Sequence, residues 1–310
     1  SFNSAVYFDL KAKLSTEDKN FEATLIRIDG KRIATGKDFD PDTGKLKNNN
    51  VYLLTEVEAN KLVKDLNAGQ WSISEIEEKI KKSNPKPPFT TSTLQQEAAR
   101  KLRFSARRTM NNAQNLYRSG FITYMRTDST NLSAEGLNGA KAEIINSFGK
   151  EYLPEKPRVY ASKVVNAQEA HEAIRPAGLK FADVNNVKTE LDEDAAKLYD
   201  LIKKRTLASQ MKSAQIEQTR LEISDSKYLF IANGKTIVFP GFLRAYVEGA
   251  DDPETDLDDM EKMLPKVAKG EKVIWGDIIP KQHFTKPINR FTEASLVKEM
   301  ESLGIGRPST

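Results

Sequence analysis

The order of strand-like and helix-like segments constrains most strongly what this 310-residue chain can fold into. Seven segments show strand patterning, in which apolar and polar residues tend to alternate: Ala5–Leu10, Glu22–Ile28, Trp71–Ile80, Gln215–Ile223, Tyr228–Ala232, Thr236–Phe239 and Lys272–Ile279. The first three precede a long helix-patterned region, and the other four follow it. One β domain built from both flanks, with the helical region as an insert, explains this order best. We therefore expect an α+β multidomain fold.

Proline marks the boundary between the first strands and the helical region. The sequence Pro85-Lys-Pro-Pro88 suits neither the interior of a helix nor that of a strand, because proline has no backbone N–H. We predict a first β part at residues 1–84, a helical domain at 85–211, a second β part at 212–280, and the start of a further helical domain at 281–310.

Capping residues predict where helices begin, because a Ser, Thr or Asp side chain can accept a hydrogen bond from the first helical turn. Four predicted starts are Thr55, Thr93, Ser133 and Asp192, the first two with Glu58 and Gln96 three residues later. Glycine predicts three ends, at Gly69, Gly120 and Gly149. The stretch between Gly120 and Ser133 is therefore expected to be extended and exposed between two helices.

Composition excludes several classes of protein. The chain has no cysteine, which excludes disulfides and cysteine-ligated zinc. No apolar run approaches the roughly 20 residues that a membrane-spanning helix needs, and the N-terminus lacks a signal-peptide pattern. We expect a cytoplasmic protein with no membrane partner.

Basic residues gather just before the most distinctive motif. The net charge is only +4, but seven basic residues and no acidic one occur between residues 100 and 126: Arg100, Lys101, Arg103, Arg107, Arg108, Arg118 and Arg126. Such a local bias suits contact with a phosphate backbone. A solvated helix face is the alternative, but the run leads directly into a candidate nucleophile, which favours a nucleic-acid interface.

The motif is Gly120–Ser133, in which Tyr124 stands two residues before Arg126. A tyrosine phenol is a weak nucleophile at neutral pH, because its ordinary pKa is about 10, so it needs a cation or a base nearby. Arginine suits a phosphodiester, because its planar fork can donate two parallel hydrogen bonds to one phosphate. The pair predicts attack on a phosphodiester. The alternatives are a packed aromatic ring at Tyr124 and a surface ion pair between Arg126 and Asp128.

The run Tyr-Met-Arg-Thr-Asp at 124–128 resembles the active-site signature of type IA DNA topoisomerases. Met125 stands where the topoisomerase III branch usually has proline, so the resemblance favours the bacterial topoisomerase I branch. Two further segments resemble the same family in the same order, 168–176 with its histidine and 290–310. The resemblance implies an arch-forming β domain interrupted by a helical domain that carries the tyrosine.

The resemblance also implies roles for single residues. Tyr124 would bond to a 5′ phosphate and release a 3′ hydroxyl, Arg126 would hold the scissile phosphate, and His171 would take part at the site. DNA contacts are expected from six further residues: Arg118, Asp128, Arg175, Arg307, Ser309 and Thr310. For the last three of these, the alternative is a helix end followed by a loop. For Arg175, pairing with Glu172 or Glu169 is an equal alternative. For Asp128, as for Thr123, Ser129 and Thr130, holding the loop is the favoured alternative.

By resemblance, the whole enzyme would relax negatively supercoiled DNA in the bacterial nucleoid, by cutting one strand, passing the other through and resealing. Its partners would be single-stranded or underwound DNA and the remaining domains of its own polypeptide. Magnesium would be held by an N-terminal Toprim domain, so we expect no cofactor and no activity in this chain alone. The acidic run Asp251–Glu261 lacks the context of magnesium ligands and is interpreted as a solvated loop. The alternative function is a non-catalytic module that binds single-stranded nucleic acid, with Tyr124 stacked on a base.

Overall fold

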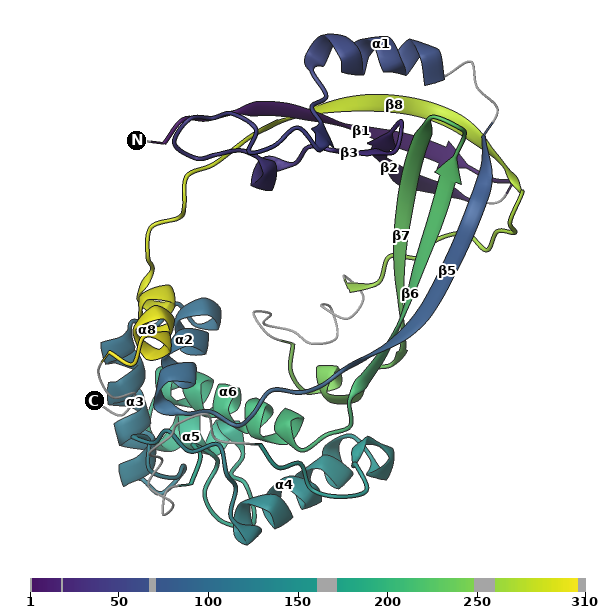
Figure 1. Ribbon diagram of the computed structural model, residues 1–310. Helices are drawn as coiled ribbons and strands as arrows, with labels where there is room; N and C mark the ends of the chain where they lie inside the picture. Colours follow the sequence, from purple (N-terminus) through teal and green to yellow (C-terminus); the bar gives the residue numbers. More distant parts are fainter. Residues whose placement is uncertain (1, 18, 67–70, 161–171, 248–259, 306–310) are drawn as a thin grey trace. The chain divides into compact units, whose positions relative to one another are not determined.

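The computed structural model describes residues 2–17, 19–66, 71–160, 172–247 and 260–305. The chain divides into two compact units, whose elements are labelled in Figure 1. The strand unit comprises Ser1–Lys81, Glu217–Thr236 and Glu261–Asn289, and the helical unit comprises Lys82–Ile216, Ile237–Met260 and Arg290–Thr310. Each unit is therefore assembled from three separate stretches of sequence.

The strand unit is built on one sheet of eight strands: β1 (Val6–Ser15), β2 (Asn20–Ile28), β3 (Lys31–Ile33), β4 (Val51–Tyr52), β5 (Trp71–Ser83), β6 (Ala214–Ser224), β7 (Tyr228–Phe239) and β8 (Lys272–Phe284). Their order is β1-β8-β5-β6-β7-β2-β3-β4, and β1 also pairs with β2. The extra pairing joins the first strand of this order to the sixth, so that six strands form a closed ring. Closure satisfies backbone groups that an open sheet would leave at its edges.

The two strands predicted at Tyr228–Ala232 and Thr236–Phe239 are one continuous strand, β7. Sequence reasoning separated them at Gly234, but this glycine marks a close approach instead of a turn. A Cβ at this position would lie 2.8 Å from Leu264 Cγ and 2.9 Å from the Lys262 carbonyl. The residue beside it, Lys235, forms an isolated antiparallel bridge with Lys262. Glycine is required here because another stretch of chain crosses the strand closely.

Strand β8 continues to Phe284, beyond the predicted end at Ile279. Antiparallel pairing with β1 carries it past a proline, with Leu10 opposite Pro280 and Val6 opposite Phe284. Strand β8 therefore also runs past residue 280, where the sequence places the end of the second β part.

Helix α1 (Glu56–Leu66) packs against β1 and β8 in the strand unit (Figure 1). Its predicted capping box is confirmed: the Thr55 N–H donates to Glu58 Oε2 at 3.2 Å, and the Glu58 N–H donates to Thr55 Oγ1 at 3.4 Å. Leu62 and Leu66 turn inward to the same core as Trp71. The glycine predicted to end this helix, Gly69, lies outside the described residues.

The helical unit contains α2 (Thr91–Lys101), α3 (Ala106–Arg118), α4 (Ala134–Ser147), α5 (Val184–Glu190), α6 (Glu193–Ser209) and α8 (Glu293–Ser302). Two predicted caps are confirmed, because Ser133 Oγ accepts from the Gly136 N–H and Asp192 Oδ1 accepts from the Ala195 N–H. Helix α6 is central: 11 of its 17 residues are buried, and they come from all sides of the helix.

The predicted start of a helix at Thr93 is wrong. Helix α2 begins at Thr91, and Thr90 is its cap. The Thr93 N–H donates to Thr90 Oγ1 at 3.3 Å, and the Thr90 N–H donates to Thr93 Oγ1 at 2.9 Å. Thr93 is thus the returning partner of the capping box and not its first residue. Sequence reasoning chose the wrong residue because several residues in the run from Thr90 to Thr93 carry hydroxyl groups able to cap a helix.

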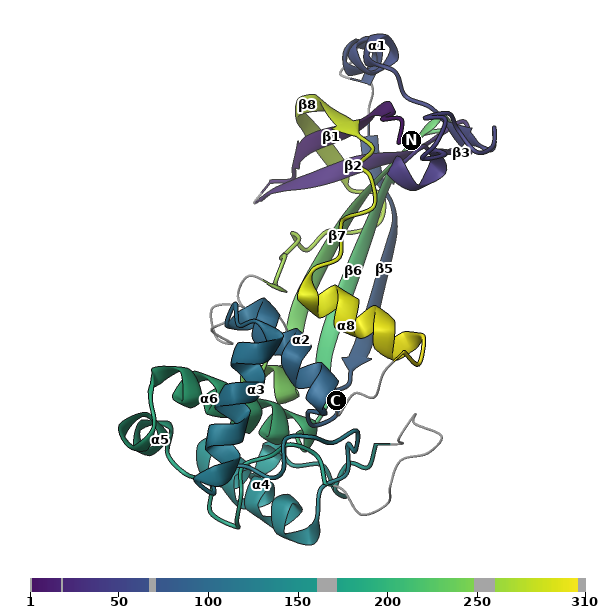
Figure 2. The ribbon, with the colours of Figure 1, turned by 90° about the vertical axis from the view of Figure 1, so that its left-hand side faces the viewer.

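Helix α8 packs against α2 within the helical unit, as Figures 1 and 2 both show. Ser92 donates to Glu301 Oε2 at 2.7 Å, and Glu293 Oε2 accepts the Ala106 N–H at 2.8 Å. Ala294 is the one residue of α8 whose side chain is fully buried. The contact is therefore largely polar.

Candidate active site

The tyrosine segment, residues 121–131, connects α3 to α4 and has no helical structure. Burial varies along it from residue to residue: Ile122, Met125 and Thr127 are buried, whereas Tyr124 and Arg126 are exposed. The apolar side chain of Met125 joins the core of the helical unit. The buried residues thus anchor the segment in the helical unit, while the side chains of Tyr124 and Arg126 are exposed to solvent.

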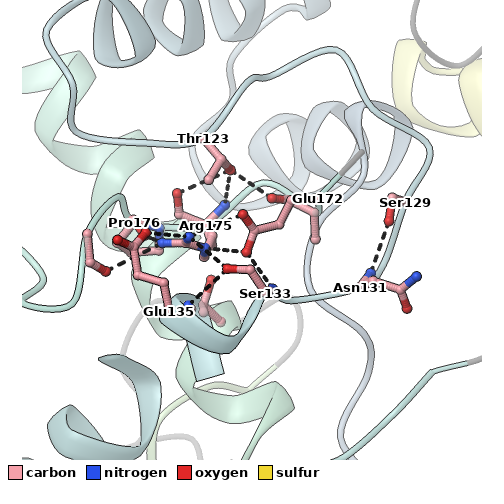
Figure 3. Close-up of polar contacts among 12 residues, drawn as sticks. Thr123, Ser129, Asn131, Ser133, Glu135, Glu172, Arg175 and Pro176 are labelled. Carbon is pink, nitrogen blue, oxygen red and sulfur yellow. Dashed lines mark hydrogen bonds and ion pairs between the residues drawn. The ribbon is translucent and has the colours of Figure 1, made fainter. Parts of the chain in front are cut away.

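One side of the tyrosine segment is paired with the stretch of chain that follows His171. The Thr123 N–H donates to the Arg175 carbonyl at 2.9 Å, and Thr123 Oγ1 donates to the Ala173 carbonyl at 2.7 Å (Figure 3). In return, the Arg175 N–H donates to Thr123 Oγ1 at 3.0 Å. An antiparallel bridge between Ile122 and Pro176 continues this pairing. The two motifs that are far apart in sequence therefore lie side by side.

The other side of the segment is held by the first turn of α2. Thr91 bonds to the backbone of Met125 and of Thr127 through its hydroxyl group. The contact fixes the backbone just after Tyr124, and Thr123 fixes it just before. Sequence reasoning missed Thr91, because a threonine at a helix start is read as a capping residue. The surplus of hydroxyl groups over the number that a cap needs indicates that one of them bonds elsewhere, but it does not indicate which one.

Tyr124 lies against a second exposed tyrosine. Its side chain is 43% exposed, and its ring meets that of Tyr117 edge to face, with ring centres 5.3 Å apart. Tyr117 lies in the last turn of α3, next to the exposed Arg118. Asp128, within the segment, is half-buried. The predicted loop-holding role of Ser129 is confirmed, because its hydroxyl accepts the Asn131 N–H at 3.2 Å.

Arg175 pairs with Thr123 of this segment through its backbone, and the residue is only 3% exposed (Figure 3). Its Nε donates to Glu172 Oε1 at 2.6 Å, and its Nη2 donates to Glu135 Oε2 at 2.9 Å and to Ser133 Oγ at 3.1 Å. Its Nη1 donates to the Pro176 carbonyl at 2.8 Å. Pairing with Glu172, the alternative to a DNA contact, is therefore present in the structure.

The charges around Arg175 favour one another. Burial alone would raise the pKa of Glu172, but hydrogen bonds from Arg175 and from the Ser133 N–H outweigh it and lower the pKa. Burial alone would lower the pKa of Arg175, but the bonds to Glu172 and Glu135 raise it. Both groups are held in their charged forms, and together they join the start of α4 to the chain after His171.

The predicted basic run serves partly to stabilise the fold. Arg100 pairs with the buried Glu97 at 3.2 Å, Arg108 pairs with Asp194 at 2.6 Å, and the Lys101 ammonium lies 4.5 Å from the centre of the Tyr246 ring. Three further arginines are exposed and form no ion pair with any described residue: Arg103, Arg107 and Arg118. The run therefore divides into residues that stabilise the fold and residues whose charges are exposed to solvent.

Four predicted site residues lie outside the described residues: His171, Arg307, Ser309 and Thr310. The acidic run Asp251–Glu261 lies outside them as well, apart from its last two residues. Among the described residues, no three His, Asp or Glu side chains come together as a metal site would require. In the same part of the chain, no helix is long and apolar enough to cross a membrane.

Comparisons with known proteins agree on one family. The sequence matches the family described as DNA topoisomerase over residues 1–310. It is 48% identical over 322 residues to DNA topoisomerase 1 of Streptomyces coelicolor, and 48% identical over 311 residues to DNA topoisomerase 1 of Synechococcus elongatus. All of this chain is covered in both cases, but only 34% and 35% of the relatives, so the chain spans about a third of their length.

A solved structure is similar over the whole chain. Full-length topoisomerase I from Thermotoga maritima superimposes with a TM-score of 0.73 and 33% sequence identity. The match covers 100% of this chain and 46% of the Thermotoga chain. The likeness therefore extends to both compact units.

Proposed function

The chain belongs to the DNA topoisomerase family, and on that premise we propose that it provides the nucleophilic tyrosine of a type IA enzyme, which cuts and reseals one DNA strand. The observation that carries the proposal is the exposure of Tyr124 and Arg126 on either side of the buried Met125. Both stand on backbone that is hydrogen-bonded to two other parts of the helical unit. A nucleophile and a phosphate-binding cation are thus presented together on a fixed support.

The proposed reaction exchanges one phosphodiester for another. The Tyr124 phenol oxygen attacks phosphorus, its bond to the 5′ phosphate forms, and the bond from phosphorus to the 3′ oxygen breaks. The phenol loses its proton and the departing 3′ oxygen gains one. Arg126 donates hydrogen bonds to the phosphate oxygens, on which negative charge develops in the transition state. Because the bond formed and the bond broken are both phosphodiester bonds, resealing is the same reaction in reverse and needs no nucleotide as an energy source.

The DNA strand is proposed to approach along the exposed arginines that precede the nucleophile. Arg103, Arg107 and Arg118 have no ion pair within the described residues, so their charges are available to phosphates. We further propose that magnesium and the groups that move the proton belong to the remaining domains of the protein. Relaxation of negatively supercoiled DNA would then require the whole polypeptide.

Replacement of Tyr124 by phenylalanine tests the proposal in the intact protein that contains this chain. Tyr124→Phe removes one oxygen and keeps the ring against Tyr117, so binding should persist while cleavage is abolished. The measurement is capture of a covalent complex with a labelled single-stranded oligonucleotide on a denaturing gel. Tyr117→Phe is the matched control, because it makes the same change in the neighbouring exposed tyrosine, and it should retain the covalent complex.

One observation also suits the alternative function, a non-catalytic module that binds single-stranded nucleic acid. Tyr117 and Tyr124 are both 43% exposed, and such a pair of rings could stack on bases. If that module were the function, Tyr124→Phe would bind and behave as the parent does. A covalent complex that survives Tyr124→Phe would remove Tyr124 as the nucleophile.

A further inference from the structure

The hydroxyl group of Thr91, in the first turn of α2, reaches the backbone on both sides of Arg126. It donates to the Met125 carbonyl at 2.7 Å and accepts the Thr127 N–H at 2.9 Å. The backbone N–H of Thr91 donates to the Thr127 carbonyl, also at 2.9 Å. Thr91 is only 2% exposed, so water does not compete for these bonds.

The two bonds from the Thr91 hydroxyl to the Met125 carbonyl and the Thr127 N–H constrain the backbone of Arg126 in particular. The Met125 carbonyl and the Thr127 N–H belong to the two peptide groups that flank the α-carbon of Arg126. Each residue has only two soft backbone dihedral angles, and both lie between those peptide groups. A single hydroxyl that bonds to both groups therefore fixes the direction in which the Arg126 side chain leaves the chain. Before Tyr124, the backbone is held by the Thr123 N–H, which donates to the Arg175 carbonyl at 2.9 Å.

We propose that Thr91 is a positioning residue for strand cleavage: its hydroxyl sets the orientation of Arg126 relative to Tyr124. The inference rests on the proposed function, since it gives Thr91 a role only where Arg126 holds the scissile phosphate. A bidentate arginine must be held within about 0.5 Å of its productive geometry. A displacement of about 1 Å can slow a reaction on the order of 100-fold without loss of binding.

Thr91→Val and Thr91→Ser in the intact protein test this role. Valine keeps the branched shape and removes every hydrogen bond of the hydroxyl, including a longer contact of 3.1 Å with the Thr127 carbonyl, whereas serine keeps the hydroxyl. The measurements are the single-turnover rate of cleavage of a labelled single-stranded oligonucleotide and the Kd for the same oligonucleotide. We expect Thr91→Val to slow cleavage roughly 10- to 100-fold with the Kd unchanged. Thr91→Ser should cleave at close to the parent rate.

Thr206→Val is the matched control for general loss of stability. Thr206 is also fully buried in the helical unit, and its hydroxyl donates to the Ile202 carbonyl at 2.8 Å, within α6. We expect Thr206→Val to lower the melting temperature as Thr91→Val does and to leave the cleavage rate unchanged. Equal slowing by both variants, or parent-like cleavage by Thr91→Val, would overturn the inference.

Two further arms keep the result interpretable. If Thr91→Val does not fold, Thr91→Cys replaces it, because a thiol is of similar size and a weaker donor. Cleavage should then fall in the order threonine, serine, cysteine, and equal rates would refute the role of the hydroxyl. Tyr124→Phe, run alongside, separates the two proposals. If Tyr124→Phe cleaves the oligonucleotide, the proposed function itself is wrong. If Tyr124→Phe does not cleave but Thr91→Val cleaves at the parent rate, only the inference about Thr91 is wrong.

Discussion

Arg175 shows how a single residue can belong to a functional motif and yet be used inside the protein. Its guanidinium is buried and bonds to two carboxylates, one hydroxyl and two backbone carbonyls. A buried charge is tolerated only when it is paired and hydrogen-bonded, and both conditions are met here. A DNA contact by Arg175 stays a prediction. Its bonds to Glu172 and Glu135 connect the stretch that pairs with the tyrosine segment to the start of α4.

The space beside Arg175 gives a prediction at the scale of one residue. A Cβ at Gly136, in the first turn of α4, would lie 2.5 Å from Arg175 Nε and 2.7 Å from its Cδ. Alanine favours a helix by about 1 kcal/mol over glycine, but Arg175 cannot move without breaking several bonds. We expect Gly136→Ala to destabilise the protein by about 1–3 kcal/mol.

Thermal or urea unfolding of the chain measures this change. Asn138→Ala is the matched control, because Asn138 is an exposed residue of the same helix, where alanine should be neutral or slightly stabilising. Equal stability of Gly136→Ala and the parent would show that the Arg175 network gives way easily.

At the scale of elements, the first turn of α2 contacts both the tyrosine segment and α8. Thr91 bonds to the tyrosine segment, and the next residue, Ser92, donates to Glu301 of α8 at 2.7 Å. Gln96, one turn later, donates to Ser92 Oγ at 3.0 Å. Polar residues that would normally be exposed on a helix are buried here, because α8 covers them.

Removal of the Glu301 carboxylate should loosen α8. Ser92 would lose its charged acceptor, and a hydrogen bond to a charged group contributes about 1.5–3 kcal/mol. We expect Glu301→Ala to speed amide hydrogen exchange throughout α8 by roughly tenfold or more, with little change in α3 and α6. Glu299→Ala is the control, since Glu299 is an exposed residue of α8. Unchanged exchange in Glu301→Ala would mean that other contacts hold the helix, such as the bond from the Ala106 N–H to Glu293.

At the scale of the whole molecule, the chain consists of two units that each gather three stretches of sequence. The predicted membership in the type IA DNA topoisomerase family and the predicted type IA-like fold are confirmed by the matching family, by the relatives and by the Thermotoga structure. The matched relatives are about three times as long, so a complete reaction is proposed only for the whole polypeptide.

The purified chain by itself is expected not to relax negatively supercoiled plasmid DNA. It holds the proposed nucleophile, Tyr124, but the proton-transfer groups and the magnesium are proposed to lie in other domains. Agarose gel electrophoresis of plasmid incubated with the chain, beside the intact protein as the positive control, measures this. Relaxation by the chain that disappears with Tyr124→Phe would contradict the proposal, because every required group would then be present here.

The sequence alone determined several features of this protein. Strand patterning located both flanks of the sheet, and capping residues located the starts of α1, α4 and α6, because these signals depend on residues close together in the chain. The motif at 124–128 identified the family for a similar reason: the candidate nucleophile Tyr124 and Arg126 are close together in sequence. One error arose where a distant residue decided the outcome, at Gly234, which is crossed by the Lys262–Leu264 stretch. Another, the helix start predicted at Thr93, arose from several neighbouring residues that can all cap a helix.

Only the tertiary structure decided which side chains support the site and which fill the interior. Nothing in the sequence distinguishes Thr91 from the hydroxyl residues around it, because its partners lie more than 30 residues away, beyond α3. In the same way, the buried guanidinium of Arg175 depends on α4, through Glu135, and on the Gly178 carbonyl. Local patterns specify elements, whereas burial and hydrogen-bond partners are set by packing between segments that are remote in sequence.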